Sequence, residues 1–351
     1  MKPEPSAPIA VDIALPRPRA RLADTLRVVG ASMGALLRAL LRRAAGRRAH
    51  PRWPLRLELV VAATRGSWSL MPKIGMVRWR NVGEALSPLA TDGLEPRFEA
   101  IDPMSGEDPP LYGAWLEPPD AEDRVLLYFH GGGFAFGSLR THGEMIGALA
   151  RAARARTFSL EYRLAPESPA PAAVADARRA YRHLLARGID PGRIALAGDS
   201  AGGTLVLDTL RALREAGDPL PGAAVAISPW VDLACSGDSF RSNEPYDFVG
   251  REHCLLAAEA YLSGGARKSN EASPLFFESF AGSPPMLVHA GSHETLVDQI
   301  RAFVERARSR GATITYVEYA DMVHVWHLLR RMTPEGGKAI DEIGAFLRAH
   351  T

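Results

Sequence analysis

Gly198-Asp199-Ser200-Ala201-Gly202 joins an apolar run, Ile194 to Ala197, to a helical pattern that continues to Arg214. A G-x-S-x-G sequence between a strand and a helix is typical of a sharp turn that exposes the serine hydroxyl above the helix N-terminus. The alternative is an ordinary serine that caps the helix. The strand before the turn and the helix after it favour Ser200 as a nucleophile.

Short apolar runs alternate with helical stretches on both sides of this turn, from about Leu94 onward. This alternation predicts an α/β fold in which a mostly parallel sheet carries helices on both faces. The first two runs are too close together for a crossover helix, so we expect them to form an antiparallel hairpin at one edge. The predicted strands are Arg97 to Ile101, Leu111 to Glu117, Val125 to His130, Thr157 to Tyr162, Ile194 to Gly198, Ala223 to Ser228, Met286 to Ala290 and Thr313 to Tyr319.

Three consecutive glycines, Gly131, Gly132 and Gly133, follow His130 at the end of the third predicted strand. Such a run costs conformational entropy and is favoured where backbone N–H groups must approach a ligand closely, although a flexible turn is the simpler interpretation. We predict an oxyanion hole formed by the N–H groups of two glycines and of Ala201. The sequence leaves open which two glycines donate. His130 is expected to hold the loop by hydrogen bonds.

A serine nucleophile needs a base, and the base needs an orienting carboxylate. In this kind of fold the chain order is nucleophile, acid, base. The segment Ala290 to Asp298 follows the seventh predicted strand and supplies carboxylates, and the segment Asp321 to His327 follows the eighth and supplies histidines.

Five motifs together resemble the hormone-sensitive-lipase-like family of α/β-hydrolase carboxylesterases, the bacterial esterase family IV. They are H-G-G-G at His130 to Gly133, Y-R-L-A-P-E at Tyr162 to Glu167, G-D-S-A-G-G at Gly198 to Gly203, S-P-W at Ser228 to Trp230 and S-P-L at Ser273 to Leu275. The resemblance covers the chain from about residue 95 to the C-terminus. It implies the α/β-hydrolase fold with eight strands, a helical cap, and hydrolysis of short- to medium-chain carboxylic esters with no cofactor and no metal.

The acid segment departs from the family pattern G-x-x-D-x-L-x-D, because Glu294 stands at the first acidic position and Asp298 at the second. We assign Glu294 as the acid, since position 298 should lie one turn into the following helix. Asp321 is a more remote candidate. His324 aligns with the base of the family. The neighbouring His293 and His327 are therefore expected to pack beside the site.

Other residues near the predicted site have two interpretations each. Phe134, Phe136, Trp230, Tyr246 and Phe248 are candidates for the substrate pocket, with core packing as the alternative. Asp199 either caps the following helix or binds the loops around the site, and we favour the cap.

The resemblance divides the chain into a leader with cap helices, 1–90, and a catalytic domain, 91–351, with a cap insertion at about 232–275. The first twenty residues are rich in proline and indicate a loosely ordered leader. Next, Leu22, Leu26, Val29, Met33, Leu36 and Leu40 form one stripe of an amphipathic helix, opposite Asp24, Arg27, Arg38 and Arg42. We expect this stripe to pack on the protein as part of a lid over Ser200; binding to an anionic membrane surface is the alternative.

Composition excludes several classes of protein. The 42 Lys and Arg exceed the 40 Asp and Glu by only two, so no nucleic-acid partner is expected, although residues 1–80 carry 16 basic and 4 acidic side chains. The two cysteines, Cys235 and Cys254, are too few for a disulfide framework and indicate a reducing, cytoplasmic location. The uncharged run Val28 to Leu37 is about half the length that a bilayer requires, so neither membrane insertion nor a secretory signal is expected.

The sequence therefore predicts a serine carboxylesterase whose partner is a small-molecule ester. An amidase, lactonase or deacetylase acting on a specific metabolite is the alternative within the hydrolases. A receptor without catalysis is the alternative outside them, but no member of the predicted triad is missing. A homodimer is left open.

Overall fold

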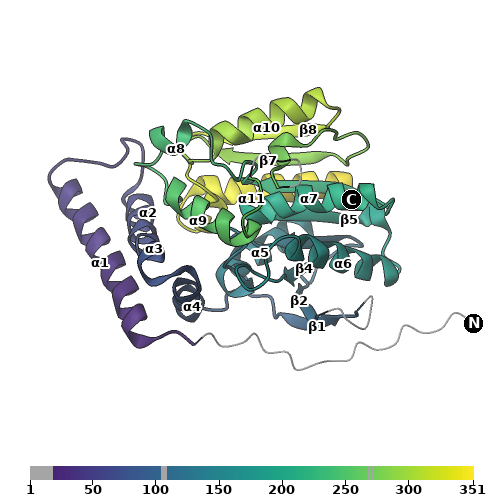
Figure 1. Cartoon of the computed structure of the whole chain (residues 1–351), viewed down its shortest axis with the longest axis horizontal. Coiled ribbons are helices and arrows are strands. Elements are labelled where there is room, and N and C mark those ends of the chain that lie inside the picture. The colour runs from purple at the N-terminus through teal and green to yellow at the C-terminus, as the bar shows by residue number, and fades with distance from the viewer. Residues whose placement is uncertain (1–18, 104–108, 268, 270–271) are drawn as a thin grey trace, which may run out of the picture.

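Eight strands form one sheet in the order β1-β2-β4-β3-β5-β6-β7-β8 (Figure 1). The structure is a computed structural model that describes residues 19–103, 109–267, 269 and 272–351. The leader predicted for the first twenty residues lies almost entirely outside these ranges. The strands are β1 (Arg97–Ile101), β2 (Leu111–Leu116), β3 (Val125–Phe129), β4 (Arg156–Glu161), β5 (Ile194–Asp199), β6 (Ala223–Ile227), β7 (Met286–Gly291) and β8 (Ile314–Tyr319).

The predicted sheet is confirmed, and each strand bound agrees with the prediction within one residue. β2 pairs antiparallel with both β1 and β4, whereas all the other pairs are parallel. The edge hairpin of β1 and β2 therefore forms as expected. β3, β5 and β6 are buried along their whole length, which explains their almost continuous apolar sequences.

Helices cover both faces of the sheet (Figure 1). In β3, Leu127 and Phe129 point to the face packed by α6 (Ala172–Ala186), α7 (Ala201–Glu215) and α10 (Val297–Ser309). Leu126 and Tyr128 point to the opposite face, packed by α5 (Leu139–Ala153) and α11 (Pro334–His350). This alternation follows from the two-residue period of a strand, and it places two apolar cores on either side of the sheet.

A layer of helices lies beside the sheet, with α1 outermost (Figure 1). It contains α1 (Leu22–Ala44), α2 (Leu55–Trp68), α3 (Met71–Ile74) and α4 (Met76–Leu86) from the N-terminal part, and α8 (Ser239–Ser242) and α9 (Arg251–Leu262) from the insertion after β6. The helix predicted near His253 to Leu262 corresponds to α9. In the described part of the chain, no helix has the length and apolarity needed to cross a membrane.

The packing predicted for α1 is wrong. The helix forms, but most of its apolar stripe faces solvent instead of the protein. α1 packs on α2 through its small residues: Ser32 Oγ donates a hydrogen bond to the Ala63 carbonyl at 3.0 Å, and a Cβ on Gly66 would lie 2.6 Å from the Ala31 carbonyl oxygen. Small side chains let the backbones of α1 and α2 lie close together, so α1 packs through this face and not through the bulky apolar stripe.

Candidate active site

Ser200 occupies the sharp turn between β5 and α7, with a φ of 54°. Its N–H donates to the Ile227 carbonyl at 2.8 Å, which anchors the turn to β6. A Cβ on Gly198 would lie 2.4 Å from the Gly202 oxygen, and one on Gly202 would lie 2.0 Å from the Phe129 oxygen. Both flanking glycines are therefore needed for the turn to pass so close to β3 and α7, and the strained turn leaves Ser200 lining a cavity.

Glu294 and His324 meet at the carboxyl ends of β7 and β8. Nδ1 of His324 lies 3.0 Å from Oε2 of Glu294, and both side chains are buried. The other carboxylate oxygen of Glu294 accepts a hydrogen bond from the Gly291 N–H at 3.2 Å. His324 lines the same cavity as Ser200. The three residues predicted as a triad therefore converge on one region of the fold.

Nearby carboxylates favour the protonated form of His324. Burial by itself would lower the pKa of His324, but the hydrogen bond and charge of Glu294, together with the charges of Asp247 and Asp199, outweigh it and raise the pKa above its ordinary value. This imidazole is consequently a stronger base than one buried without a carboxylate partner.

The alternative acids are engaged elsewhere. Oδ2 of Asp298 accepts from the Ser239 N–H at 2.8 Å, and Oδ1 pairs with Arg301 at 3.3 Å, within the first turn of α10. Oδ1 of Asp321 pairs with Arg52 at 2.6 Å. In the described chain, neither carboxylate bonds to His324.

Asp199 does not cap α7, so the interpretation that we favoured for it is wrong. Its Oδ1 accepts from the Gly131 N–H at 3.0 Å and from the Tyr128 hydroxyl at 2.7 Å, and Oδ2 lies 3.3 Å from Nε2 of His142. The hydrogen bond to Asp199 occupies the N–H of Gly131, which removes this glycine from the candidate oxyanion donors.

Three other N–H groups remain for an oxyanion. Among the described residues, the backbone N–H groups of Gly132, Gly133 and Ala201 have no hydrogen-bond acceptor. Gly132 and Gly133 line the cavity, and Gly132 has a φ of 120° that a side chain rarely tolerates. This arrangement suits the binding of a negatively charged oxygen.

His130 holds the glycine loop, as predicted. Its Nδ1 lies 2.8 Å from the Gly131 carbonyl oxygen, its carbonyl accepts from the Tyr162 hydroxyl at 2.8 Å, and the two rings stack with centroids 4.3 Å apart. Burial lowers the pKa of His130 to about 3, so the ring is neutral.

The cavity has a volume of about 340 Å³, and three of the five predicted pocket residues, Phe136, Trp230 and Phe248, line it. The other two predictions are wrong. Phe134 has a φ of 61° and stacks on Tyr261 in the core at a centroid distance of 3.9 Å. Tyr246 instead packs against His293, with centroids 4.9 Å apart, outside the cavity lining.

The N-terminal helices supply pocket walls that the sequence did not reveal. Trp68 at the end of α2 and Trp79 in α4 line the cavity with ring centroids 4.9 Å apart, and both pack against Phe136. His253 of α9 lies against Trp68 at 5.2 Å. The only available signal was the presence of three tryptophans in residues 1–90, Trp53, Trp68 and Trp79, because the relative placement of the helices depends on tertiary contacts.

Asp247 is a further residue that the sequence did not reveal, although Tyr246 and Phe248 on either side were candidates. Its side chain is buried and accepts hydrogen bonds from the N–H groups of Thr295 at 2.8 Å and His324 at 3.3 Å. An acidic residue between two aromatic residues was the signal.

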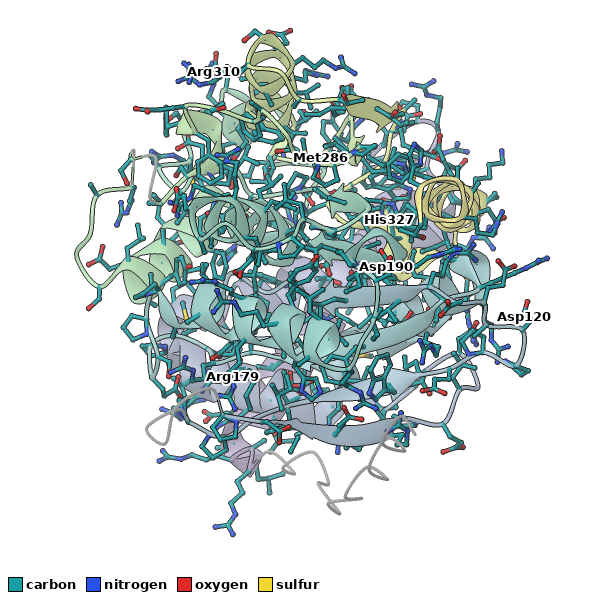
Figure 2. The ribbon with its side chains drawn as sticks, turned by 90° about the vertical axis from the view of Figure 1, so that its right-hand side faces the viewer. Asp120, Arg179, Asp190, Met286, Arg310 and His327 are labelled. Atoms are coloured by element: carbon teal, nitrogen blue, oxygen red, sulfur yellow. The ribbon has the colours of Figure 1, made fainter. Side chains whose placement is uncertain are left out.

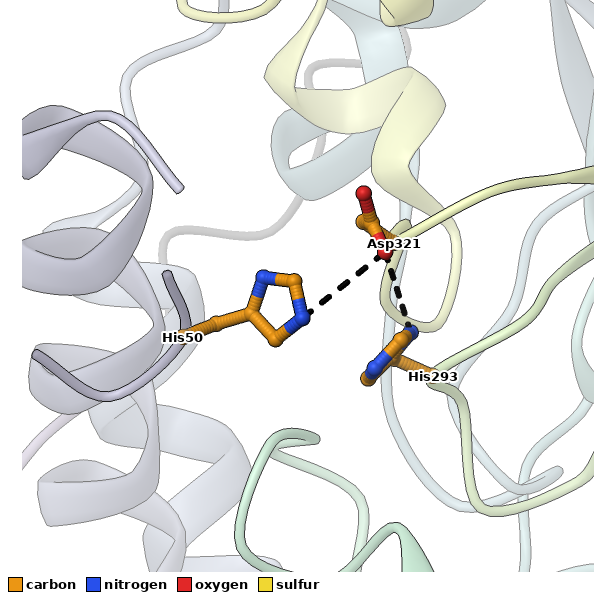
Figure 3. A group of neighbouring side chains, drawn as sticks. All are labelled: His50, His293 and Asp321. Carbon is orange, nitrogen blue, oxygen red and sulfur yellow. Dashed lines mark ion pairs between the residues drawn. The ribbon is translucent and has the colours of Figure 1, made fainter. Parts of the chain in front are cut away.

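Three residues with metal-ligating side chains gather beside this site: His50, His293 and Asp321 (Figure 3). Nε2 of His50 lies 3.7 Å and Nδ1 of His293 lies 3.9 Å from the Asp321 carboxylate. The Arg52 guanidinium already neutralises this carboxylate, and Trp53 Nε1 donates to the Asp321 carbonyl at 2.8 Å. The cluster therefore ties the connection between α1 and α2 to the loops that carry Glu294 and His324.

His327 is the remaining histidine near the triad, and its side chain is buried in the interior of the molecule. Figure 2 shows its position, with Asp120 at the edge of the molecule for comparison. Nε2 of His327 lies 3.1 Å from Nδ1 of His289. Burial lowers the pKa of His327 well below its ordinary value. A neutral, packed ring agrees with the structural role predicted for it.

Comparison with known proteins identifies the family of the chain. A sequence model of the family described as having the α/β-hydrolase fold matches residues 126–328. The acetyl-hydrolase of Streptomyces hygroscopicus is 46% identical over 238 residues, covering 68% of this chain and 79% of that protein. A crystal structure of EstE5 has a TM-score of 0.73 at 37% identity, covering 79% of this chain and 92% of the other. An esterase from the bacterial hormone-sensitive lipase family has a TM-score of 0.69 at 39% identity, covering 95% and 99%.

The fold and the matches define an α/β hydrolase. The chain belongs to the hormone-sensitive-lipase-like family of bacterial esterases, and it is a carboxylic ester hydrolase.

Proposed function

We propose that the chain is a serine carboxylesterase that hydrolyses short- to medium-chain esters through an acyl-enzyme intermediate. The contact between His324 Nδ1 and Glu294 Oε2 at 3.0 Å, in the same cavity as Ser200, carries this proposal. Because Nδ1 of His324 faces the Glu294 carboxylate, Nε2 of the same ring remains available for the hydroxyl of Ser200.

In the first half of the reaction, Ser200 Oγ attacks the ester carbonyl carbon and His324 Nε2 takes the hydroxyl proton. Glu294 stabilises the imidazolium that forms. The imidazolium then gives the proton to the leaving alkoxide, which departs as the alcohol. Water repeats the sequence on the acyl-enzyme, releases the carboxylic acid and restores Ser200.

The negative charge that develops on the carbonyl oxygen is stabilised by the N–H groups of Gly132, Gly133 and Ala201. Their lack of other acceptors in the described chain supports this role. Donors held in place before the reaction stabilise the transition state without reorganisation.

The cavity supports the proposed chain length. A volume of about 340 Å³, walled by Trp68, Trp79, Phe136 and Phe248, is small and largely aromatic. A second candidate is the removal of acetyl groups from a specific metabolite, because the 46% identical relative is named an acetyl-hydrolase.

A hydrolysis profile tests the proposal and separates the two candidates. Acetyl, butyryl, octanoyl and palmitoyl esters of p-nitrophenol are compared in the native protein and in Ser200→Ala. We expect activity on the shorter esters that is lost in Ser200→Ala, and a fluorophosphonate probe attached to Ser200. Activity near the native level in Ser200→Ala would contradict the serine mechanism, and activity confined to acetyl esters would favour the deacetylase.

A further inference from the structure

The outer face of α1 exposes a large apolar stripe. Seven side chains on it are 40% to 74% exposed: Leu22, Leu26, Val29, Met33, Leu37, Leu40 and Leu41. At 100° per residue these positions fall on one side of the helix, so they form a single surface and not scattered side chains. Contiguous exposed apolar surface of this kind marks an interaction site.

The opposite side of α1 is committed to the protein, so the helix cannot rotate to bury the stripe. Asp24 is buried and bonds to the Arg78 guanidinium of α4 through both carboxylate oxygens. Ser32 bonds to the Ala63 carbonyl of α2, and Gly66 leaves room for the α1 backbone. The exposed stripe is therefore a fixed feature of the folded chain.

The charge around this face is strongly basic. Residues 19–80 contain 14 Lys and Arg but only two acidic residues, Asp24 and Glu58. Both acids are buried and paired, Asp24 with Arg78 and Glu58 with Arg43 at 2.7 Å. Within residues 19–80, acidic side chains are thus withdrawn from the surface, while exposed arginines remain.

Two of these arginines, Arg27 and Arg38, are exposed on the polar side of the helix. Because the exposed stripe extends as far as Leu41, they follow it along one border at 100° per residue. Arg42, Arg47 and Arg48, at and after the end of the helix, are also exposed. An apolar stripe bordered by arginines is the pattern of a helix that lies in the plane of an anionic bilayer, with its apolar side chains among the acyl chains.

We propose that the outer face of α1 docks the protein on an anionic lipid surface. Charge complementarity favours a lipid surface over a second copy of this chain, because a symmetric contact between two α1 helices would bring like charges together. α1 lies at the periphery of the molecule, free of the sheet (Figure 1). α2 lies between α1 and the cavity, since its Val60, Thr64 and Trp68 line the cavity and its Ala63 bonds to α1.

Docking in this way differs from membrane insertion, because the helix lies along the surface and stays packed on α2. It is also independent of the esterase chemistry, because no residue of α1 lines the cavity in the described chain. Ser200→Ala should therefore bind vesicles as the native protein does.

Flotation with lipid vesicles tests the proposal on the full chain. Vesicles of phosphatidylcholine alone are compared with vesicles of equal parts phosphatidylcholine and phosphatidylglycerol. We expect binding to the anionic vesicles that weakens as salt is raised, because salt screens the arginines. The triple variant Leu26→Glu/Met33→Glu/Leu37→Glu should lower the bound fraction at least about tenfold, while hydrolysis of a soluble short ester stays near the native rate.

Two further variants separate the contributions. Arg27→Gln/Arg38→Gln should weaken binding to anionic vesicles and reduce its salt dependence. Leu256→Glu, at an exposed leucine of α9 that does not line the cavity, is the matched control and should bind as the native protein does.

Three outcomes would overturn the proposal. They are no binding of the native protein to anionic vesicles, equal binding by the triple variant, and a native dimer that the triple variant converts to monomer in sedimentation without any vesicle binding. The last would assign the face to a second copy of this chain.

Discussion

The carboxylate of Asp247 accepts a hydrogen bond from the backbone N–H of His324, with 3.3 Å between Oδ1 and N. Its other oxygen accepts from the N–H of Thr295, the residue after Glu294, at 2.8 Å. A single buried side chain of the insertion thus holds both the loop of the proposed base and the loop of the proposed acid. Asp247 is therefore a positioning residue that sets the distance between these loops.

Replacing this carboxylate should disturb both loops. In Asp247→Asn the amide group must face one of the backbone N–H donors, which leaves a buried donor without an acceptor. We expect the free energy of unfolding to fall by about 1–3 kcal/mol and kcat to fall up to about 100-fold, with a smaller change in KM. Urea unfolding and steady-state kinetics measure both effects.

Asp238→Asn is the matched control, because the Asp238 side chain lies in the same insertion but is exposed. It should match the native protein in both measurements. Native kcat and native stability in Asp247→Asn would show that the two loops keep their places without this carboxylate.

The acid assignment is tested by two nearly isosteric variants. Glu294→Gln should lower kcat by several orders of magnitude, on the order of 10⁴, because an amide favours the wrong tautomer of the imidazole. Asp298→Asn should have a small effect, since Asp298 bonds to Ser239 and Arg301. Steady-state kinetics decides between them, and a larger loss in Asp298→Asn with the fold intact would refute the assignment.

The pH dependence should report the raised pKa of His324. The base must be neutral to accept the serine proton, so activity is lost as pH falls through this pKa. Because Glu294 raises the pKa of His324, the acid limb of kcat/KM should lie above the ordinary histidine value of about 6.5.

In Glu294→Gln the charge of Glu294 is gone, and burial of His324 is opposed by the smaller contributions of Asp247 and Asp199. The pKa of His324 should therefore fall, and the limb should move to lower pH. The rate of fluorophosphonate labelling, followed over the same pH range, reports this shift even where turnover is slow. If the acid limb lies at the same pH in Glu294→Gln as in the native protein, the pair of His324 and Glu294 does not set the pH profile.

The glycine loop provides a fourth prediction. In Gly132→Ala the new Cβ would lie 2.0 Å from the Phe136 carbonyl oxygen, at a backbone φ of 120°. The loop must shift, and loss of one oxyanion donor should lower kcat by about 10²- to 10³-fold. Kinetics and circular dichroism distinguish this loss from unfolding.

Gly337→Ala is the control for adding a methyl group, because no atom lies within 4 Å of its Cβ position in α11. It should keep native kcat and unfold with a free energy higher by about 0.5–1 kcal/mol, since alanine favours a helix. Equal kcat in Gly132→Ala and the native protein would exclude the N–H of Gly132 as an essential donor.

The sheet and the order of the proposed triad could be predicted because their signals are local. Strands buried on both faces have almost continuous apolar sequences, and the turn at Ser200 requires its glycines wherever the rest of the chain lies. The choice of Glu294 over Asp298 also followed from local structure. α10 begins at Val297, so Asp298 lies within that helix, as the sequence predicted.

The pocket depended on contacts between distant segments. Phe134 and Phe136 are close in sequence, yet the backbone of Phe134 adopts a positive φ and its ring stacks on Tyr261 in the core, while Phe136 meets Trp68 and Trp79. The sequence could not predict this difference, because composition and periodicity are the same for an aromatic residue in either place.

For α1, the apolar period alone predicts a helix over Leu22 to Leu41, because the period of 3.6 residues is a local property. The observed helix, Leu22–Ala44, agrees with it, but which of its faces packs depends on contacts with α2 and α4. The small residues opposite the stripe let the α1 backbone approach Gly66, and Asp24 reaches Arg78. Periodicity shows that a helix has two faces, but the choice between them depends on the shape and charge of the surface on which the helix packs.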